Sequence, residues 1–148
     1  MASKYSTGYQ RAYVTVPSEK IAIGEQSGVI KSLYTEYVAS GELATTDTLY
    51  LGKLPPGARV IGGMIKCPAS GATGILDVGY QANGVDSADL NAFVEGADPG
   101  AADVAAQLAG AGVGKKFTVE TVVVCTPSEI TASLDTLTLQ VWLNYVVD

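Results

Sequence analysis

The sequence predicts an all-β protein, an antiparallel β-sandwich with one or two short helical turns in a loop. Apolar residues make up 47% of the 148 residues and charged residues only 16%, which is too apolar for a disordered chain. The last segment, 136–147, alternates apolar and polar residues with the period of two that is typical of a half-buried strand. The 17 glycines and 6 prolines divide the rest into short apolar segments, as in sandwiches and barrels.

The first predicted strands lie before residue 67. A long, rather polar strand is expected at 29–38, followed by strands at 48–54 and 58–66. Between the last two, Leu54-Pro55-Pro56-Gly57 predicts a turn, because proline fixes φ and glycine supplies a positive φ. We therefore expect 48–66 to form a hairpin, and the pair Gly62-Gly63 to mark a bulge or a sheet corner within it.

Three more strands are expected at 74–80, 117–125 and 136–147. In the first of them Leu76, Val78 and Tyr80 are expected to point inward. Proline lacks the N–H that pairs in a sheet, so Pro68 and Pro127 are each expected to end the strand that precedes them.

Helix is expected only between these strands. The segment 86–94 predicts one short helix, with Asp86 or Ser87 as its cap and Leu90 and Phe93/Val94 as its apolar side. The segment 101–109 is interpreted either as a second helical turn or as a flexible loop bounded by glycines.

Composition excludes several classes of enzyme. The chain has no histidine, so a Ser-His-Asp triad, a Cys-His pair and His-ligated zinc are ruled out. Two cysteines are too few for a four-cysteine zinc or iron–sulfur site, and a net charge of 9 − 15 = −6 argues against nucleic-acid binding. The chain contains no run of 18 apolar residues, so no membrane span is predicted. Its first residues show no signal-peptide pattern. We therefore expect that the protein is not an enzyme and that it has neither a cofactor nor a membrane partner. We expect it to be assembled in a cytoplasm.

Two motifs invite a binding site and have plainer interpretations. Gly114-Lys115 is similar to the end of a phosphate loop, but Ala109 stands where the first glycine belongs and Lys116 where Ser or Thr would bind magnesium. We expect only a loop that leads into the strand at 117–125. The acids that raise a calcium hypothesis are Asp86, Asp89, Glu95, Asp98 and Asp103. They match no EF-hand spacing, so we expect solvated loop carboxylates and assign no metal ligand or catalytic residue.

Cys67 and Cys125 each end a predicted strand and could lie side by side in a sandwich. A disulfide between them would close a long loop and add about 4 kcal/mol in the chain-entropy model. Because no secretory signal is present, two buried thiols are the favoured interpretation.

Charge is uneven along the chain. Residues 1–74 hold seven basic and five acidic side chains (+2), whereas residues 75–148 hold two and ten (−8). This is either chance over a solvated surface or a molecule with a mildly basic contact region and an acidic outer region.

The first 20 residues are interpreted as an N-terminal arm, and 21–148 as one sandwich domain. Tyrosine and arginine are enriched at the centre of protein interfaces. The candidate docking residues of the arm are Lys4, Tyr5, Tyr9, Arg11 and Tyr13. The alternative is a mobile terminus with no partner.

The segment 48–63, TLYLGKLPPGARVIGG, resembles small structural proteins of tailed bacteriophages. The likeness continues through 76–80, the loop with Asp86, and the closing strand 136–147, and so covers roughly residues 40–148. It points to head decoration, or cement, proteins of the jelly-roll type. That resemblance implies a jelly-roll sandwich, often trimeric, on the capsid exterior, with the major capsid protein as its partner.

We therefore expect a homotrimer that cements a phage head, because multivalency sums many modest contacts. An alternative is a β-sandwich module that binds a glycan or a host surface through exposed aromatic rings. The candidate aromatic residues for that module are Tyr34, Tyr37, Tyr50, Tyr80 and Trp142. A coplanar strip of rings would favour the module, and a small hydrolase would require two carboxyl groups that face each other.

Overall fold

The computed structural model describes residues 29–39, 41–67, 74–99, 104–108, 110–130 and 136–147, and within these ranges all regular structure is β-strand. The strands are β1 (Lys31–Val38), β2 (Leu49–Leu54), β3 (Ala58–Cys67), β4 (Gly74–Tyr80), β5 (Asp89–Ala97), β6 (Val104–Gln107), β7 (Thr121–Ile130) and β8 (Thr138–Val147).

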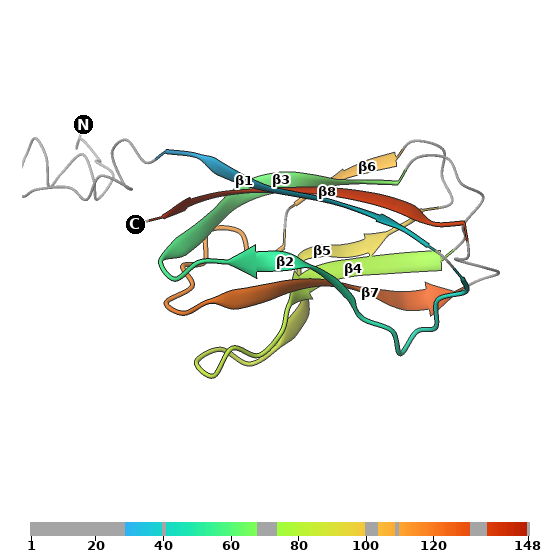
Figure 1. Cartoon of the computed structure of the whole chain (residues 1–148), viewed down its shortest axis with the longest axis horizontal. Coiled ribbons are helices and arrows are strands. Elements are labelled where there is room, and N and C mark those ends of the chain that lie inside the picture. Colours follow the sequence, from blue (N-terminus) through green and yellow to red (C-terminus); the bar gives the residue numbers. More distant parts are fainter. Residues whose placement is uncertain are drawn as a thin grey trace, which may run out of the picture.

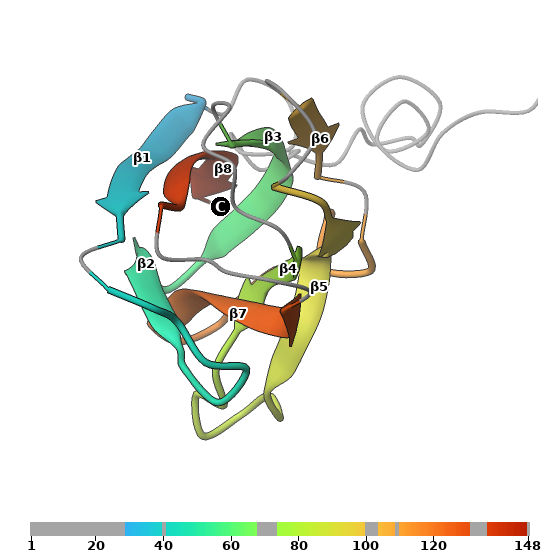
Figure 2. The same cartoon turned by 90° about the vertical axis from the view of Figure 1, so that its right-hand side faces the viewer.

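These strands form two antiparallel sheets, ordered β1-β8-β3-β6 and β2-β7-β4-β5. The two sheets lie over each other as layers in both views (Figures 1 and 2). β4 and β5 are successive strands of one sheet, whereas every other pair of successive described strands is divided between the two sheets. Eight strands wound in this way over two sheets make a jelly roll. The predicted sandwich and its jelly-roll type are therefore confirmed.

The strand predicted at the end of the chain is confirmed as β8, at the centre of its sheet between β1 and β3. Leu139, Val141 and Leu143 are buried while Trp142 points to the other face, so the period of two holds through Leu143. At the end of the strand it changes phase, because Val146 is buried and Val147 is exposed. β1 and β4 also lie where the sequence predicted strands. Leu76, Val78 and Tyr80 of β4 are buried as expected.

The predicted hairpin at 48–66 is wrong, although its turn is correct. Gly57 has a φ of 83°, and the N–H of Ala58 donates to the carbonyl of Pro55 over 3.1 Å. However, β2 pairs with β7, and β3 pairs with β8 and β6. The turn is thus a corner between the two layers. Turn residues specify a reversal of the chain, whereas the partner of each strand depends on long-range packing, which the local sequence does not contain.

The predicted helix at 86–94 is also wrong, because β5 occupies Asp89–Ala97. Ala92, Phe93 and Val94 are buried in succession, and the pairing of β4 with β5 contains two register shifts. Irregular pairing removes the period of two from the sequence, and the remaining apolar cluster then imitates a helix face. Within the segment 101–109, residues 104–107 form β6, which pairs with β3, in place of the predicted helical turn or loop.

β7 differs from its prediction at both ends. It begins at Thr121, not at 117, and continues through Pro127 to Ile130. Pro127 is opposite Leu76, next to a register shift between Ile75 and Leu76. A proline is tolerated where a bulge interrupts the hydrogen-bond ladder, so Pro127 does not end the strand.

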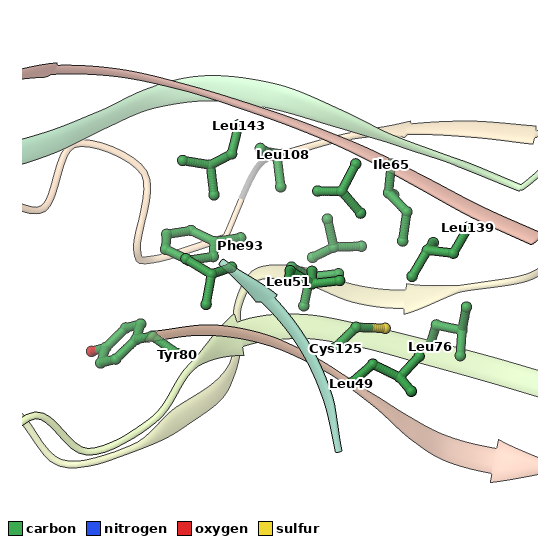
Figure 3. Packing of buried hydrophobic residues seen from close by; sticks show 14 of the residues in the cluster. Leu49, Leu51, Ile65, Leu76, Tyr80, Phe93, Leu108, Cys125, Leu139 and Leu143 are labelled. Atoms are coloured by element: carbon green, nitrogen blue, oxygen red, sulfur yellow. The ribbon is translucent and has the colours of Figure 1, made fainter. Parts of the chain in front are cut away.

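The core lies between the sheets and contains an aromatic cluster near one end. Figure 3 shows Tyr80 and Phe93 there, and Leu49, Leu76 and Cys125 farther along the core. Phe117 is fully buried although it precedes β7, and its ring lies edge-on to Tyr80 at 4.9 Å. The loop 110–120 therefore supplies part of the core as well as connecting two strands.

Candidate functional site

The acids considered for calcium do not converge. Among the described residues, no group of three or more Cys, Asp or Glu side chains is placed to hold a metal ion. Of these acids, Asp86 forms an ion pair with Lys115 through its carboxylate. Asp103 lies outside the described residues.

Lys115, the candidate phosphate-loop lysine, is occupied by contacts within the domain. Its Nζ lies 2.8 Å from Asp86 Oδ1, donates to the Tyr80 hydroxyl over 2.8 Å, and stands 4.9 Å from the centre of the Tyr80 ring. Hydrogen bonds from Lys115 and Asn83 lower the pKa of Asp86, and the bonds to Asp86 and Tyr80 raise the pKa of Lys115. These contacts fasten the β4–β5 loop to the loop before β7, which agrees with the plainer interpretation of Gly114-Lys115.

The two cysteines are buried and free. Cys67 belongs to one sheet and Cys125 to the other, and both belong to the core cluster. Burial raises the pKa of Cys67 to about 11, with a further contribution from the charge of Asp98. Burial also raises the pKa of Cys125. Thiols with such values are protonated at neutral pH and react slowly.

The aromatic residues named for a glycan site do not form one strip. Tyr80 is buried, Tyr37 packs against the core, and Tyr50 is on β2 of the opposite sheet. Only Tyr34 and Trp142 adjoin, with ring centres 5.1 Å apart and planes inclined by 39°. The coplanar surface that would favour sugar stacking is therefore not formed by these five side chains.

The Tyr34–Trp142 pair instead forms part of an apolar row across the outer face of the β1-β8-β3-β6 sheet. In the strand register Tyr34 is opposite Trp142, and Trp142 is opposite Met64. Tyr34 is 52% exposed and Met64 38% exposed. We call these three residues the aromatic face.

A bulge in β3 places Met64 on this face. The register shifts between Val60 and Gly62, so the alternation of β3 changes phase after the bulge. As a result Ile65 and Cys67 point into the core while Met64 points outward. The predicted bulge is present, with its register shift between Val60 and Gly62, directly before Gly63. Sequence reasoning missed Met64 because its neighbours across the sheet depend on that one-residue shift.

A hollow lies beside the aromatic face. The hollow, about 290 Å³, is lined by Gly63, Met64, Trp142 and Asn144. A side chain at Gly63 would approach the carbonyl oxygen of Trp142 and the side chain of Leu108, so close contact between the strands requires glycine there. The hollow is open and at the small end of the range for ligand pockets, so it suits a single protein side chain better than a cofactor.

The predicted arm residues Lys4, Tyr5, Tyr9, Arg11 and Tyr13 lie outside the described residues. None of the described segments is a helix long and apolar enough to cross a membrane.

The described part of the chain is therefore a jelly roll with an apolar row on the outer face of one sheet. No family model and no curated protein sequence matches the chain. Its fold is similar to a chain in the capsid of Ralstonia phage GP4, with a TM-score of 0.67 and 17% identity over 82% of this chain and 86% of that one. It is similar to a chain in the capsid asymmetric unit of cyanophage Pam1, with a TM-score of 0.67 and 19% identity over 90% and 96%.

A third similar chain comes from the acid-stable capsid of Helicobacter pylori bacteriophage KHP30, with a TM-score of 0.51 and 20% identity over 80% of this chain and 94% of that one. At these identities the likeness establishes the jelly-roll fold. It covers nearly all of each chain that it matches.

Proposed function

We propose that this chain is a structural protein of a bacteriophage virion, not an enzyme, that binds the capsid exterior and cements the head shell as a homotrimer. The observation that carries the proposal is the likeness to chains from three phage capsids, over 86%, 96% and 94% of those chains. Each of them is therefore little larger than one jelly-roll domain. We infer from this size that the chain is an accessory unit added to a shell.

The described surface supports a role in association. Four apolar side chains on and just before β1 are more than half exposed. They are Val29, Ile30, Tyr34 and Val38. Contacts between copies and with the shell would cover such residues. Repetition over a lattice would then multiply modest individual affinities.

Charge favours a protein partner. The net charge of −6 opposes nucleic acid, and the major capsid protein is the proposed partner. The arm, with Lys4, Arg11 and its tyrosines, would contact neighbouring capsid subunits, and the acidic loops within 77–103 would face solvent. Assembly would take place in the host cytoplasm.

The test uses the full chain and phage heads assembled without it. Light scattering at low and moderate salt is expected to give about three times the 15.2 kDa of one chain. The protein should co-sediment with the heads and raise the temperature at which they rupture. Absence of co-sedimentation at micromolar concentration would overturn the proposal, and a monomeric mass both free and on heads would overturn the trimer.

The arm is tested separately. A full-length variant with Tyr5, Tyr9 and Tyr13 replaced by serine should bind heads more weakly, because it loses three large contact surfaces. Its thermal unfolding should match that of the parent chain. Unchanged binding would remove the arm from the proposal while leaving cementing itself intact.

A further inference from the structure

The aromatic face has the composition of a binding hot spot. Tyr34, Trp142 and Met64 belong to residue types enriched at the centres of interfaces. The Tyr34 and Trp142 rings pack against each other, with their centres 5.1 Å apart. The hollow beside Trp142 offers a partner side chain a place to insert.

Polar residues flank this row on the neighbouring rungs of the sheet. On one side Gln140 donates a hydrogen bond to Glu36 over 2.7 Å, and Lys66 is opposite Gln140 in the register. On the other side Ser32 is opposite Asn144. An apolar centre with a polar border excludes water from the contact. One acid and one base among these described residues give no net charge, which suits a protein surface rather than a polyanion.

The place where the chain enters the domain relates this face to the arm. Residues 1–28 precede the first described residue, Val29, and can span at most about 90 Å. They lead into β1, which carries Tyr34 and is an edge strand of this sheet. β1 lies in the upper layer of Figure 1, and β2, β4, β5 and β7 form the lower one. An arm bound to the shell would therefore join the domain at the edge of this sheet.

We infer that the aromatic face is the shell-facing side of the domain, and that it receives an apolar side chain from the outer surface of the capsid protein in the hollow beside Trp142. This inference rests on the proposed function. It adds a second contact, on the folded domain, to the contact proposed for the arm. The β2-β7-β4-β5 sheet then faces outward.

The experiment titrates heads assembled without this protein with full-length variants. Tyr34→Ala and Met64→Glu change exposed side chains on the face, and the matched control Tyr50→Ala removes an exposed tyrosine from the opposite sheet. We expect each face variant to raise the Kd about tenfold or more, and the control to leave it within about twofold. Circular dichroism and thermal unfolding verify that all three variants are folded.

Each other outcome separates this inference from the proposed function. If the parent chain does not bind heads, the proposed function fails and the inference falls with it. If the parent chain binds heads and both face variants bind with the same Kd as the parent, only the inference is overturned. Equal weakening by Tyr50→Ala would also overturn it, and so would a changed oligomeric mass of free Tyr34→Ala, because the face would then join copies of this chain.

Besides the capsid protein and a second copy, the third candidate to cover the aromatic face is the chain's own arm. Trp142 is the single tryptophan, so its fluorescence in the free protein reports what covers the face. The serine variant at Tyr5, Tyr9 and Tyr13 should leave the emission maximum unchanged. A shift to longer wavelength in that variant would show that the arm covers the face, and would overturn the inference.

Discussion

Removal of the Phe117 ring is expected to be among the most damaging single changes in this domain. The side chain is fully buried, with its centre 4.9 Å from that of Tyr80 and 6.3 Å from that of Phe93, edge-on to both. Its backbone also ties the loop to the rest of the fold. The N–H donates to Ala58 over 2.8 Å, and the carbonyl accepts from Gly57 over 2.7 Å.

The expected magnitude follows from this burial. A buried Phe→Ala change costs about 3–5 kcal/mol through lost transfer free energy and a cavity. Phe117→Leu retains most of the apolar volume and loses mainly the two aromatic contacts, each worth about 0.5–1.5 kcal/mol. Leucine should therefore cost about 1–3 kcal/mol. Because whole domains have a free energy of unfolding of only about 5–15 kcal/mol, the alanine variant gives up a large fraction of it.

Urea unfolding at a fixed protein concentration measures both variants, with far-ultraviolet circular dichroism and Trp142 fluorescence as two probes. Coincident transitions and an unchanged slope would justify comparison of the midpoints. A loss below about 1 kcal/mol for Phe117→Ala, or equal losses for alanine and leucine, would refute the placement of this ring at the centre of the aromatic cluster.

Three further predictions concern other parts of the domain. Gly63→Ala should unfold at a much lower temperature than Gly62→Ala, because a Cβ at Gly63 would collide with the carbonyl oxygen of Trp142 while one at Gly62 meets nothing within 4 Å. Similar melting temperatures would contradict this. The pKa of Asp86 is lowered from 3.8 in the folded state, so its contribution to stability is present above that pH and lost as the pH falls through the folded value. In Asp86→Asn the free energy of unfolding should therefore fall less steeply as the pH is lowered into the acid range. An unchanged pH dependence would contradict the ion pair with Lys115. In the native protein at pH 8, Cys67 and Cys125 should resist a thiol reagent that labels both at once in urea, since burial raises both pKa values. Rapid labelling of the native protein would contradict their burial.

The fold class and most strands could be predicted because they depend on local pattern. The alternation in β8 and the inward row of β4 follow from a period of two, which the chain carries in its own sequence. The turn at Pro55-Pro56-Gly57 has a similarly local cause in the φ preferences of these residues. The absence of histidine excludes whole classes of catalysis by composition alone, because no other side chain ordinarily titrates near neutral pH.

Strand partners could not be predicted in this way. β2 and β3 adjoin in sequence and belong to different sheets, because each buries its apolar side against the opposite layer. β5 loses its alternation at two register shifts, so its sequence imitates a helix. Both errors come from the same cause, since pairing energy is shared between residues far apart in the chain.

What the sequence by itself determined was an all-β, histidine-free chain with short strands and a tyrosine-rich first segment. What only the tertiary structure decided was which side chains meet on a surface. Tyr34, Met64 and Trp142 come from three strands, and the bulge in β3 changes which of its side chains point outward. A one-residue shift reverses every side chain that follows it, so a surface of this kind exists only once the strands have paired.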